Sequence, residues 1–326
     1  MFQQQRLARV YRDLRLASAI VAGSAACSSP ANKHAADADT SRLAPLVSGQ
    51  IAVDDDTGHP VVLRAPAKRI ISLVPSGTEV LVALGAARSV VGRTMYDPEP
   101  ELARIPSVGG GLNPNAETMI GLAPDLLITW AGTKNDPVRE QLASAGAAIY
   151  SMRTRDTGDV FQSIARLAHL TGRDSAGHAL ALRIRAELNA VRRSVAGRAT
   201  PSVLFIVWGD PPMTAGPKTF IAQLISIAGG RSLFPDVDKD WPQVSVEEIV
   251  RRSPDYLVLP VGEDRNVARL RNAPGWRDLP AVKDGRIIEI PADLVNRPGP
   301  NIAEAARRLR DGIHPELNRP SPVGVR

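Results

Sequence analysis

The residue types that most often carry out catalysis are scattered or incomplete in this sequence. The five histidines form no HExxH pattern, and a single cysteine cannot make a CxxC pair. Gly109-Gly110-Gly111 lacks the lysine and hydroxyl residue of a phosphate-binding loop, and no serine stands in a G-x-S-x-G turn. Zinc binding, phosphate binding and hydrolase chemistry are therefore disfavoured. We expect no enzymatic activity, no cofactor and no bound metal.

One pair of acidic residues does recur in matching surroundings. Residues 115–125 and 245–255 share a polar first residue, a glutamate two positions later, and a Pro-Asp pair at the end. The polar residue is typical of a helix N-cap, so Glu117 and Glu247 are predicted to lie in the first turn of a helix. Each copy is interpreted as a helix, a Pro-Asp turn and a buried strand. The chain is therefore expected to contain two lobes of similar build.

Two interpretations of these glutamates are open. A carboxylate in a first helical turn can simply offset the helix dipole, which is worth about 0.3–1 kcal/mol. Alternatively, a symmetric pair of carboxylates, Glu117 and Glu247, could dock on a partner that is itself two-fold symmetric. The matched pair favours docking.

The composition is that of a globular chain without a nucleic-acid partner. With 326 residues and 44% hydrophobic residues, the chain is long enough for two domains with sizeable cores. Its net charge of +6 comes from arginines spread along the chain. No basic run is interleaved with aromatic residues, and no RNA- or DNA-binding motif is present, so a solvated basic surface explains the charge.

The N-terminal residues have the layout of an export signal. Several arginines precede a short apolar stretch, which ends just before the single cysteine, Cys27. This stretch is too short to cross a bilayer. Residues 1–26 are predicted to be a signal peptide, and residues 27–49, rich in Ala, Ser, Asp and Pro, a flexible tether. The protein is therefore expected to be exported.

The residues around Cys27 resemble a bacterial lipobox, in which the cysteine is lipidated and becomes the mature N-terminus. Ser24 departs from the leucine that is usual at that position. Two outcomes follow. Either Cys27 anchors the protein to the outer face of the cytoplasmic membrane, or cleavage after Ala26 releases a soluble periplasmic protein.

The remaining chain alternates between predicted strands and helices, which indicates an α/β fold with mostly parallel sheets. Residues 50–156 are predicted to form the N-terminal lobe and residues 199–315 the C-terminal lobe, followed by a tail at 316–326. Residues 157–198 carry apolar side chains at helical spacing and connect the lobes. A helix from about Ser175 to Val195 would extend about 30 Å, enough to reach across both lobes.

Aromatic residues mark the expected ligand site. Trp130 and Trp208 each stand at the carboxyl end of a predicted strand, one in each lobe, and Trp241 precedes the second glutamate helix. Ligands of open α/β sheets bind at these strand ends. Tryptophans can also fill a core, which is our interpretation of Trp276. Neighbouring loops add three further candidates at this edge: Tyr96, Asp293 and Arg297.

Several segments together resemble the substrate-binding proteins of ABC importers for cobalamin, haem and iron siderophores. They are residues 70–79, 115–117, 123–126 and 241–247, and the match covers about residues 50–315. Within this family the pattern is nearest to that of the cobalamin binders. The resemblance implies two α/β lobes joined by one long rigid backbone helix, with a corrinoid held between the lobes and no reaction.

The resemblance also implies roles for individual residues. Aromatic contacts with the ligand carry over to Tyr96, Trp130, Trp208 and Trp241, and polar contacts to Asp293 and Arg297. The resemblance further implies that Glu117 and Glu247 meet arginines on the two permease subunits, which work with an ATPase.

One departure from the cobalamin binders keeps other ligands open. Where they have a further tryptophan, this chain has Gly111, so that wall of the pocket is thinner. A cobinamide, a haem or a siderophore is therefore also considered. Anionic siderophores would call for several converging arginines, and only Arg297 clearly qualifies. A lipid-anchored sensor or scaffold that uses the same fold without transport is the remaining alternative.

Overall fold

The computed structural model describes residues 49–132, 137–209, 211–261 and 267–318. By its internal contacts the chain divides into two units, Met1–Ala44 and Pro45–Arg326, and every described residue belongs to the second. The predicted signal peptide, Cys27, nearly all of the predicted tether and the predicted tail from residue 319 onward lie outside the described residues. Apart from residues 133–136, 210 and 262–266, both predicted lobes lie within the described part of the chain.

The N-terminal lobe is built on a parallel sheet in the order β4-β3-β5-β6. The central strands β3 (Ile70–Ser72) and β5 (Leu126–Trp130) are almost completely buried, as expected for parallel strands covered on both faces. The outer strands are β4 (Val90–Gly92) and β6 (Ala148–Met152). The helical segments of this lobe are α1 (Pro75–Ala83), η2 (Ala87–Ser89), η3 (Pro100–Leu102), α2 (Ala116–Gly121) and α3 (Pro137–Ser144).

The C-terminal lobe has a second sheet, in the order β11-β10-β7-β8, with β9 (Arg231–Ser232) also paired to β7. Three strands run parallel: β7 (Ser202–Gly209), β10 (Tyr256–Val261) and β11 (Ile287–Pro291). β8 (Pro212–Thr214) returns antiparallel on β7, as its short connection requires. The helical segments are α6 (Phe220–Ile227), α7 (Val246–Arg252), α8 (Val267–Asn272), α9 (Pro280–Lys283), α10 (Ala292–Asn296), α11 (Ile302–Ile313) and η4 (Pro315–Asn318).

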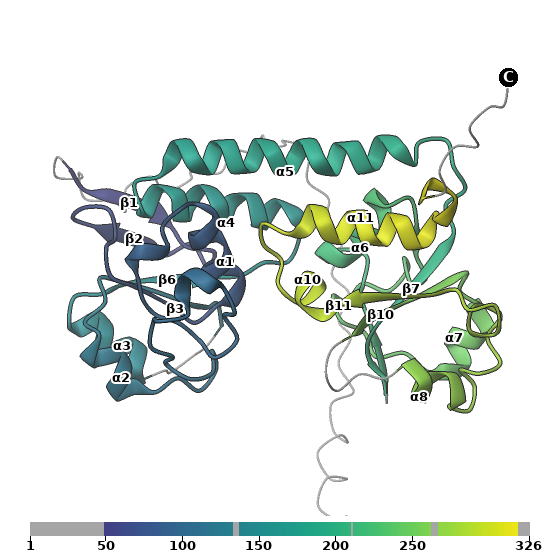
Figure 1. Ribbon diagram of the computed structural model, residues 1–326. Coiled ribbons are helices and arrows are strands. Elements are labelled where there is room, and N and C mark those ends of the chain that lie inside the picture. Colours follow the sequence, from purple (N-terminus) through teal and green to yellow (C-terminus); the bar gives the residue numbers. More distant parts are fainter. Residues whose placement is uncertain (1–48, 133–136, 210, 262–266, 319–326) are drawn as a thin grey trace, which may run out of the picture. The chain divides into compact units, whose positions relative to one another are not determined.

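Two helices connect the lobes. α4 (Thr157–Leu170) packs against α1, and α5 (Asp174–Ser194) contacts α4 at one end and α6 and α11 at the other (Figure 1). A Cβ at Gly177 would lie 2.5 Å from the Cβ of Ala168, so only glycine permits this close approach of α4 and α5. The two-lobed α/β fold and the long connecting helix are confirmed.

Helix α1 begins at Pro75. A proline fits the first turn of a helix because its missing N–H would have no intrahelical partner there. This start makes Ser76 and Glu79 helical residues. Glu79 is thereby fixed on a rigid element directly after the carboxyl end of β3.

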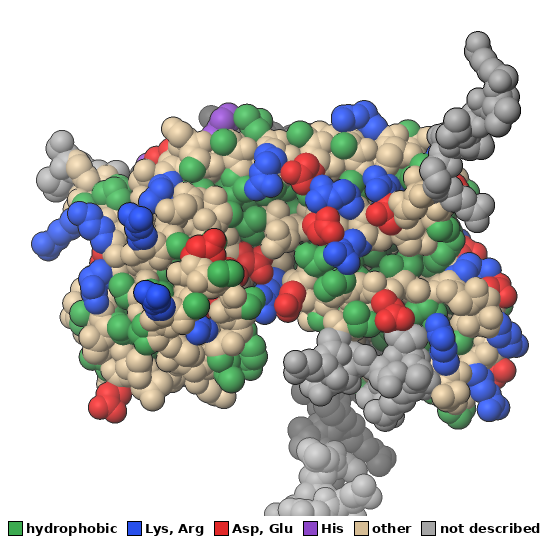
Figure 2. All heavy atoms as spheres, in the orientation of Figure 1, with side chains coloured by type: hydrophobic (Ala, Val, Ile, Leu, Met, Phe, Trp, Pro, Cys, Tyr) green, Lys and Arg blue, Asp and Glu red, His purple; other side chains and the backbone are tan. Residues whose placement is uncertain are grey.

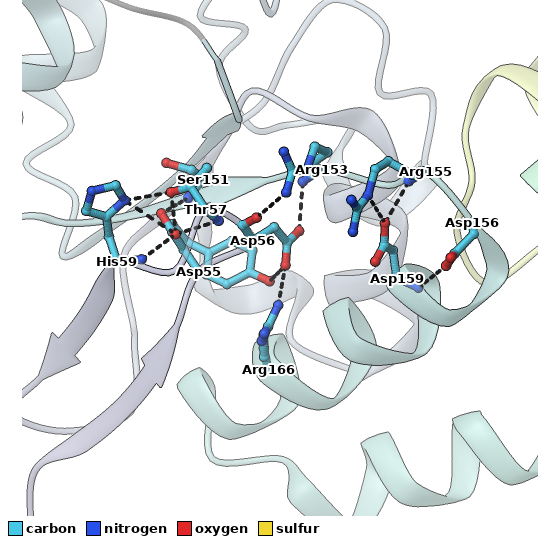
Figure 3. Close-up of polar contacts among 11 residues, drawn as sticks. Asp55, Asp56, Thr57, His59, Ser151, Arg153, Arg155, Asp156, Asp159 and Arg166 are labelled. Atoms are coloured by element: carbon cyan, nitrogen blue, oxygen red, sulfur yellow. Dashed lines mark hydrogen bonds and ion pairs between the residues drawn. The ribbon is translucent and has the colours of Figure 1, made fainter. Parts of the chain in front are cut away.

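The first hairpin is tied to the sheet of the N-terminal lobe through its turn (Figure 3). β1 (Ile51–Asp54) pairs antiparallel with β2 (Pro60–Leu63). In the turn, the buried Asp55 carboxylate accepts hydrogen bonds from the backbone N–H of Thr57 at 2.8 Å and of Ser151, in β6, at 3.2 Å. Burial opposes ionisation, but these and further hydrogen bonds outweigh it and lower the pKa of Asp55.

Asp56 makes the second connection between this turn and β6. Its carboxylate accepts hydrogen bonds from the backbone N–H of Arg153 at 2.7 Å and from the Tyr150 hydroxyl at 3.1 Å, and pairs with Arg166 of α4 (Figure 3). Burial nevertheless raises the pKa of Asp56. The hairpin is thus fastened to both β6 and α4.

The sequence repeat is also a repeat in backbone geometry. Ala123 follows α2 with φ 43°, and Ser253 follows α7 with φ 47°; among the described residues no other non-glycine has a positive φ. Left-handed backbone is unfavourable for residues with a side chain, and the proline that follows each of them disfavours the right-handed helical region. Both helices therefore stop at the same kind of sharp turn.

The aspartate after each proline secures that turn. The Asp125 carboxylate accepts hydrogen bonds from the backbone N–H of Lys68 at 2.8 Å and of Arg69 at 3.0 Å. In the second lobe the Asp255 carboxylate accepts hydrogen bonds from the backbone N–H and the hydroxyl of Ser202, both at 2.7 Å. In each lobe one carboxylate joins the glutamate helix to the first strand of the sheet.

We expect Asp255→Ala to lower the free energy of unfolding by about 1–3 kcal/mol, because two donors of Ser202 lose their acceptor. Urea denaturation at pH 7 measures this loss. Asp284→Ala is the control, since the Asp284 side chain is 54% exposed and pairs with Arg286, and surface pairs contribute at most about 1 kcal/mol. Equal loss of stability in both variants would contradict the role of Asp255.

Candidate ligand-binding site

In the N-terminal lobe, two of the predicted contact residues lie on either side of a glycine segment. Tyr96 follows β4 and is 56% exposed, whereas Trp130 ends β5 and is half-buried. A Cβ at Gly110 would lie 3.9 Å from the Tyr96 ring, and one at Gly111 would lie 3.4 Å from Trp130 Nε1. The glycine segment therefore brings the two aromatic residues to one edge of the sheet.

Gly111 is required by the backbone at this point. A Cβ at this position would lie only 2.3 Å from the carbonyl oxygen of Leu73, at the carboxyl end of β3, so no larger residue fits without moving the backbone. The backbone conformation of this loop therefore excludes a tryptophan at position 111. Beside it, Leu112 is 73% exposed and Met95 is 64% exposed. Sequence reasoning missed these two apolar side chains, because nothing local distinguishes an exposed from a buried aliphatic residue.

In the C-terminal lobe, Trp208 and Trp241 belong to neighbouring backbone segments. Trp208 lies near the end of β7 and pairs in register with Met213 of β8. The loop that carries Trp241 runs along β8, since the N–H of Thr214 donates to the carbonyl of Pro242 at 3.0 Å. The Trp241 side chain is 44% exposed. This lobe therefore presents an open indole close to the carboxyl end of β7.

The predicted polar pair, Asp293 and Arg297, follows β11 but is not free for a ligand alone. Arg297 Nη2 lies 3.2 Å from Asp293 Oδ1, and Arg297 Nη1 lies 3.5 Å from Glu79 Oε1 of α1. The Arg297 side chain is 15% exposed and that of Glu79 is 11% exposed, whereas that of Asp293 is 69% exposed. Asn301 adds a hydrogen bond to Glu79 Oε2 at 3.3 Å. Arg297, which follows α10 in the C-terminal lobe, is thereby paired with Glu79 of the N-terminal lobe.

Glu79 is the buried acid of this group. Burial raises the pKa of Glu79 to about 7; the positive charge of Arg297 opposes the rise, and Glu99 and Asp293 reinforce it. Three carboxylates thus surround a single guanidinium. Sequence reasoning included Glu79 in the family motif without giving it a role, because its partner is more than two hundred residues away.

The two predicted docking glutamates lie on separate lobes, each in the first turn of its helix. The side chains of Asn115 and Ser245 accept hydrogen bonds from the third helical N–H of α2 and α7, at 2.8 and 3.1 Å. Glu117 and Glu247 are both exposed. The predicted N-caps and helix starts are confirmed.

Two surface pockets lie away from the predicted ligand residues. One, of about 390 Å³, is lined by Arg231, Leu233, Pro235, Arg251 and Arg252. The other, of about 520 Å³, lies between β11 and α11. Within the described residues, no cluster of three His, Cys, Asp or Glu side chains could hold a metal ion. Of the helices in that part of the chain, none has the length and apolar character that a bilayer crossing demands.

Two lobes with parallel sheets, linked by helices and presenting aromatic side chains at the strand ends, define a solute-binding protein. The model of a family described as periplasmic binding protein matches residues 70–294. The chain belongs to this family, and the resemblance noted in the sequence is confirmed.

Individual relatives are similar over most of their length. The chain is 27% identical to an uncharacterized ABC transporter substrate-binding lipoprotein of Bacillus subtilis, over 96% of this chain and 98% of the relative. It is 30% identical to the vitamin B12-binding protein of Photorhabdus laumondii, over 76% of this chain and 88% of the relative.

Solved structures show the same architecture. The periplasmic vitamin B12-binding protein BtuF of Vibrio cholerae superposes with a TM-score of 0.65 and 26% identity, over 78% of this chain and 99% of the other. A periplasmic haem-binding protein of Pseudomonas aeruginosa superposes with a TM-score of 0.68 and 25% identity, over 76% and 93%. Fold similarity alone therefore does not separate the two kinds of ligand.

Glu79 gives this site a pH dependence that can be measured. Because its pKa is raised from 4.5 to about 7, the folded protein holds a proton that the unfolded chain releases. Its contribution to stability is complete below about pH 4.5 and is lost as the pH rises to about 7. We expect Glu79→Gln to remove this fall, which has an upper limit of about 3 kcal/mol.

Chemical denaturation at pH 5, 6, 7 and 8 measures the effect. Asp284→Asn is the control, because the Asp284 side chain is 54% exposed and pairs with Arg286, so this variant should leave the pH dependence close to that of the wild type. A parallel pH profile in wild type and Glu79→Gln would show that Glu79 does not titrate in this range.

Proposed function

We propose that this protein is the substrate-binding component of an ABC importer and that its solute is a corrinoid, held between the two lobes. The observation that carries the proposal is the pair of exposed aromatic side chains, Tyr96 in one lobe and Trp241 in the other, at the carboxyl ends of the strands. Large flat rings offer faces against which such side chains stack. Trp130 and Trp208 are the further aromatic contacts in this proposal.

The charges around Arg297 favour a corrinoid over haem. Arg297 is paired with Glu79 and Asp293, and Glu99 adds a third carboxylate nearby. This acidic environment repels the propionates of haem or the carboxylates of a siderophore, whereas the amide groups at the edge of a corrinoid can donate to the exposed Asp293. The relative named as a vitamin B12-binding protein supports the same choice.

Haem is the second candidate, because a haem-binding protein has a similar fold at 25% identity. Gly111 bears on the choice, since the backbone of Leu73 excludes a larger side chain beside Trp130. This wall of the site therefore lacks one aromatic contact, so a cobinamide is a third candidate. Absorption spectra of the purified protein after incubation with cyanocobalamin, cobinamide or haemin distinguish the three ligands.

The proposal includes no chemical step. The corrinoid is cargo, and the protein's own residues only bind, orient and release it. The protein's role would end when it delivers the corrinoid to a permease.

We expect Trp241→Ala to weaken cyanocobalamin binding by about 5- to 150-fold, or about 1–3 kcal/mol, because an indole buried against the ligand would be lost. Quenching of tryptophan fluorescence measures the affinity. Trp276→Phe serves as the matched control, since Trp276 is 4% exposed within the core of the C-terminal lobe. Equal affinity loss in both folded variants would mean that the ligand site is elsewhere.

We also propose that Glu117 and Glu247 dock on a permease dimer that works with an ATPase. They lie on equivalent helices of different lobes and are both exposed, which suits a two-fold symmetric partner. A lipid-anchored sensor or scaffold would not need this symmetry. The net positive charge is not assigned to binding of a nucleic acid, because basic and acidic side chains are interspersed on the face shown in Figure 2.

The double variant Glu117→Arg with Glu247→Arg should keep its affinity for the ligand and lose uptake, with each single variant intermediate, because a reversed charge repels the basic residues of a partner. Cyanocobalamin titration and uptake of labelled cyanocobalamin are measured on the same variants, together with melting temperature. Normal uptake by the double variant would leave both glutamates as helix-dipole residues only.

We further propose that Cys27 anchors the protein by a lipid to the outer face of the cytoplasmic membrane. Cys27 is the only cysteine of the chain, and the relative in Bacillus subtilis is named a lipoprotein. Cys27→Ser should abolish incorporation of labelled fatty acid. Unchanged labelling of that variant would favour the soluble periplasmic form.

A further inference from the structure

Each glutamate helix exposes an apolar side chain beside its glutamate. Ile120 is 44% exposed and Val250 is 43% exposed, and each stands three positions after the glutamate of its helix. Residues three apart in a helix lie on the same face. Both lobes therefore present a carboxylate next to a β-branched side chain.

The repeat extends to burial along both segments. From residue 113 to 120 and from residue 243 to 250, exposed, half-buried and buried positions follow in the same order. Met119 and Ile249, each fully buried at 0% exposure, fix their helices to the core. Their neighbours Ile120 and Val250 must then point outward, so their exposure follows from the packing of the helix.

The charges of α7 are arranged so that one carboxylate is left for a partner. Glu248 binds Arg251 at 2.5 Å and Arg252 at 2.6 Å, and Arg252 also pairs with Asp236. Within the described residues, neither Glu117 nor Glu247 takes part in an ion pair. Helices α2 and α7 therefore have two kinds of exposed side chain in common, a carboxylate without an ion-pair partner in that part of the chain and an apolar group.

We propose that Ile120 and Val250 are the apolar anchors of the docking surface, each entering an apolar depression beside a basic residue on one of two equivalent permease subunits. This inference rests on the proposed function and adds the chemistry of the partner. The repeat of the same two groups on both lobes is what a partner with two like surfaces would recognise.

The two kinds of side chain have different tasks at such an interface. Exposed carboxylates speed and orient the encounter, and salt screens their effect. Apolar groups that become buried slow dissociation, and salt does not screen them. Ile120 and Val250 would therefore set how long the loaded protein stays on the permease, and Glu117 and Glu247 how fast it arrives.

The test measures binding of the full-length protein, loaded with cyanocobalamin, to the purified permease–ATPase complex in lipid nanodiscs. The double variant Ile120→Ser with Val250→Ser should dissociate about tenfold faster or more, with an unchanged association rate. Glu117→Ala with Glu247→Ala should instead slow association, and only at low salt. Val62→Ser is the matched control, a valine that is 42% exposed on β2.

Each outcome separates this inference from the proposed function. If the wild type binds the complex and the Ile120/Val250 variant dissociates at the same rate, the anchors are refuted and the importer role stands. If the wild type does not bind at all, the proposed function fails and this inference with it. If the protein alone self-associates through these residues, the occupant is a second copy and the inference is wrong.

Discussion

The architecture depends on one repeated interaction, a carboxylate that joins the end of a helix to the start of a neighbouring strand. Asp125 accepts hydrogen bonds from the two residues just before β3, and Asp255 accepts hydrogen bonds from the first residue of β7. Each strand they fasten, β3 or β7, leads at its carboxyl end to residues of the candidate ligand site. Each helix they fasten carries one of the two glutamates proposed for docking. One carboxylate per lobe therefore couples a surface suited to a partner with a surface suited to a ligand.

Much of this could be predicted from the sequence because the signals are local. The N-caps Asn115 and Ser245, the Pro-Asp turns and the apolar strands all act within a few residues, and the structure confirms them. The pairing of Glu79 with Arg297 could not be predicted in this way, since it joins residues of different lobes.

The candidate ligand site shows the same division between local and non-local information. The positions of Tyr96 and Trp241 at strand ends follow from the order of the elements, but their exposure depends on loops that pack from elsewhere. The sequence shows that position 111 lacks a side chain. It does not show the reason, which is that the carbonyl oxygen of Leu73 lies where a side chain would begin, a contact that only three-dimensional packing creates. The missing aromatic side chain and the required glycine are therefore the same feature.

The hairpin at the start of the described chain has a further consequence for a protein that works outside the cytoplasm. β6 ends the order of the N-terminal sheet, and an open strand edge invites pairing with another chain. The turn at Asp55 and Asp56 occupies backbone groups of Ser151 and Arg153 along that edge. Held by two carboxylates, the hairpin covers this edge of the sheet and so hinders strand exchange with neighbouring molecules there.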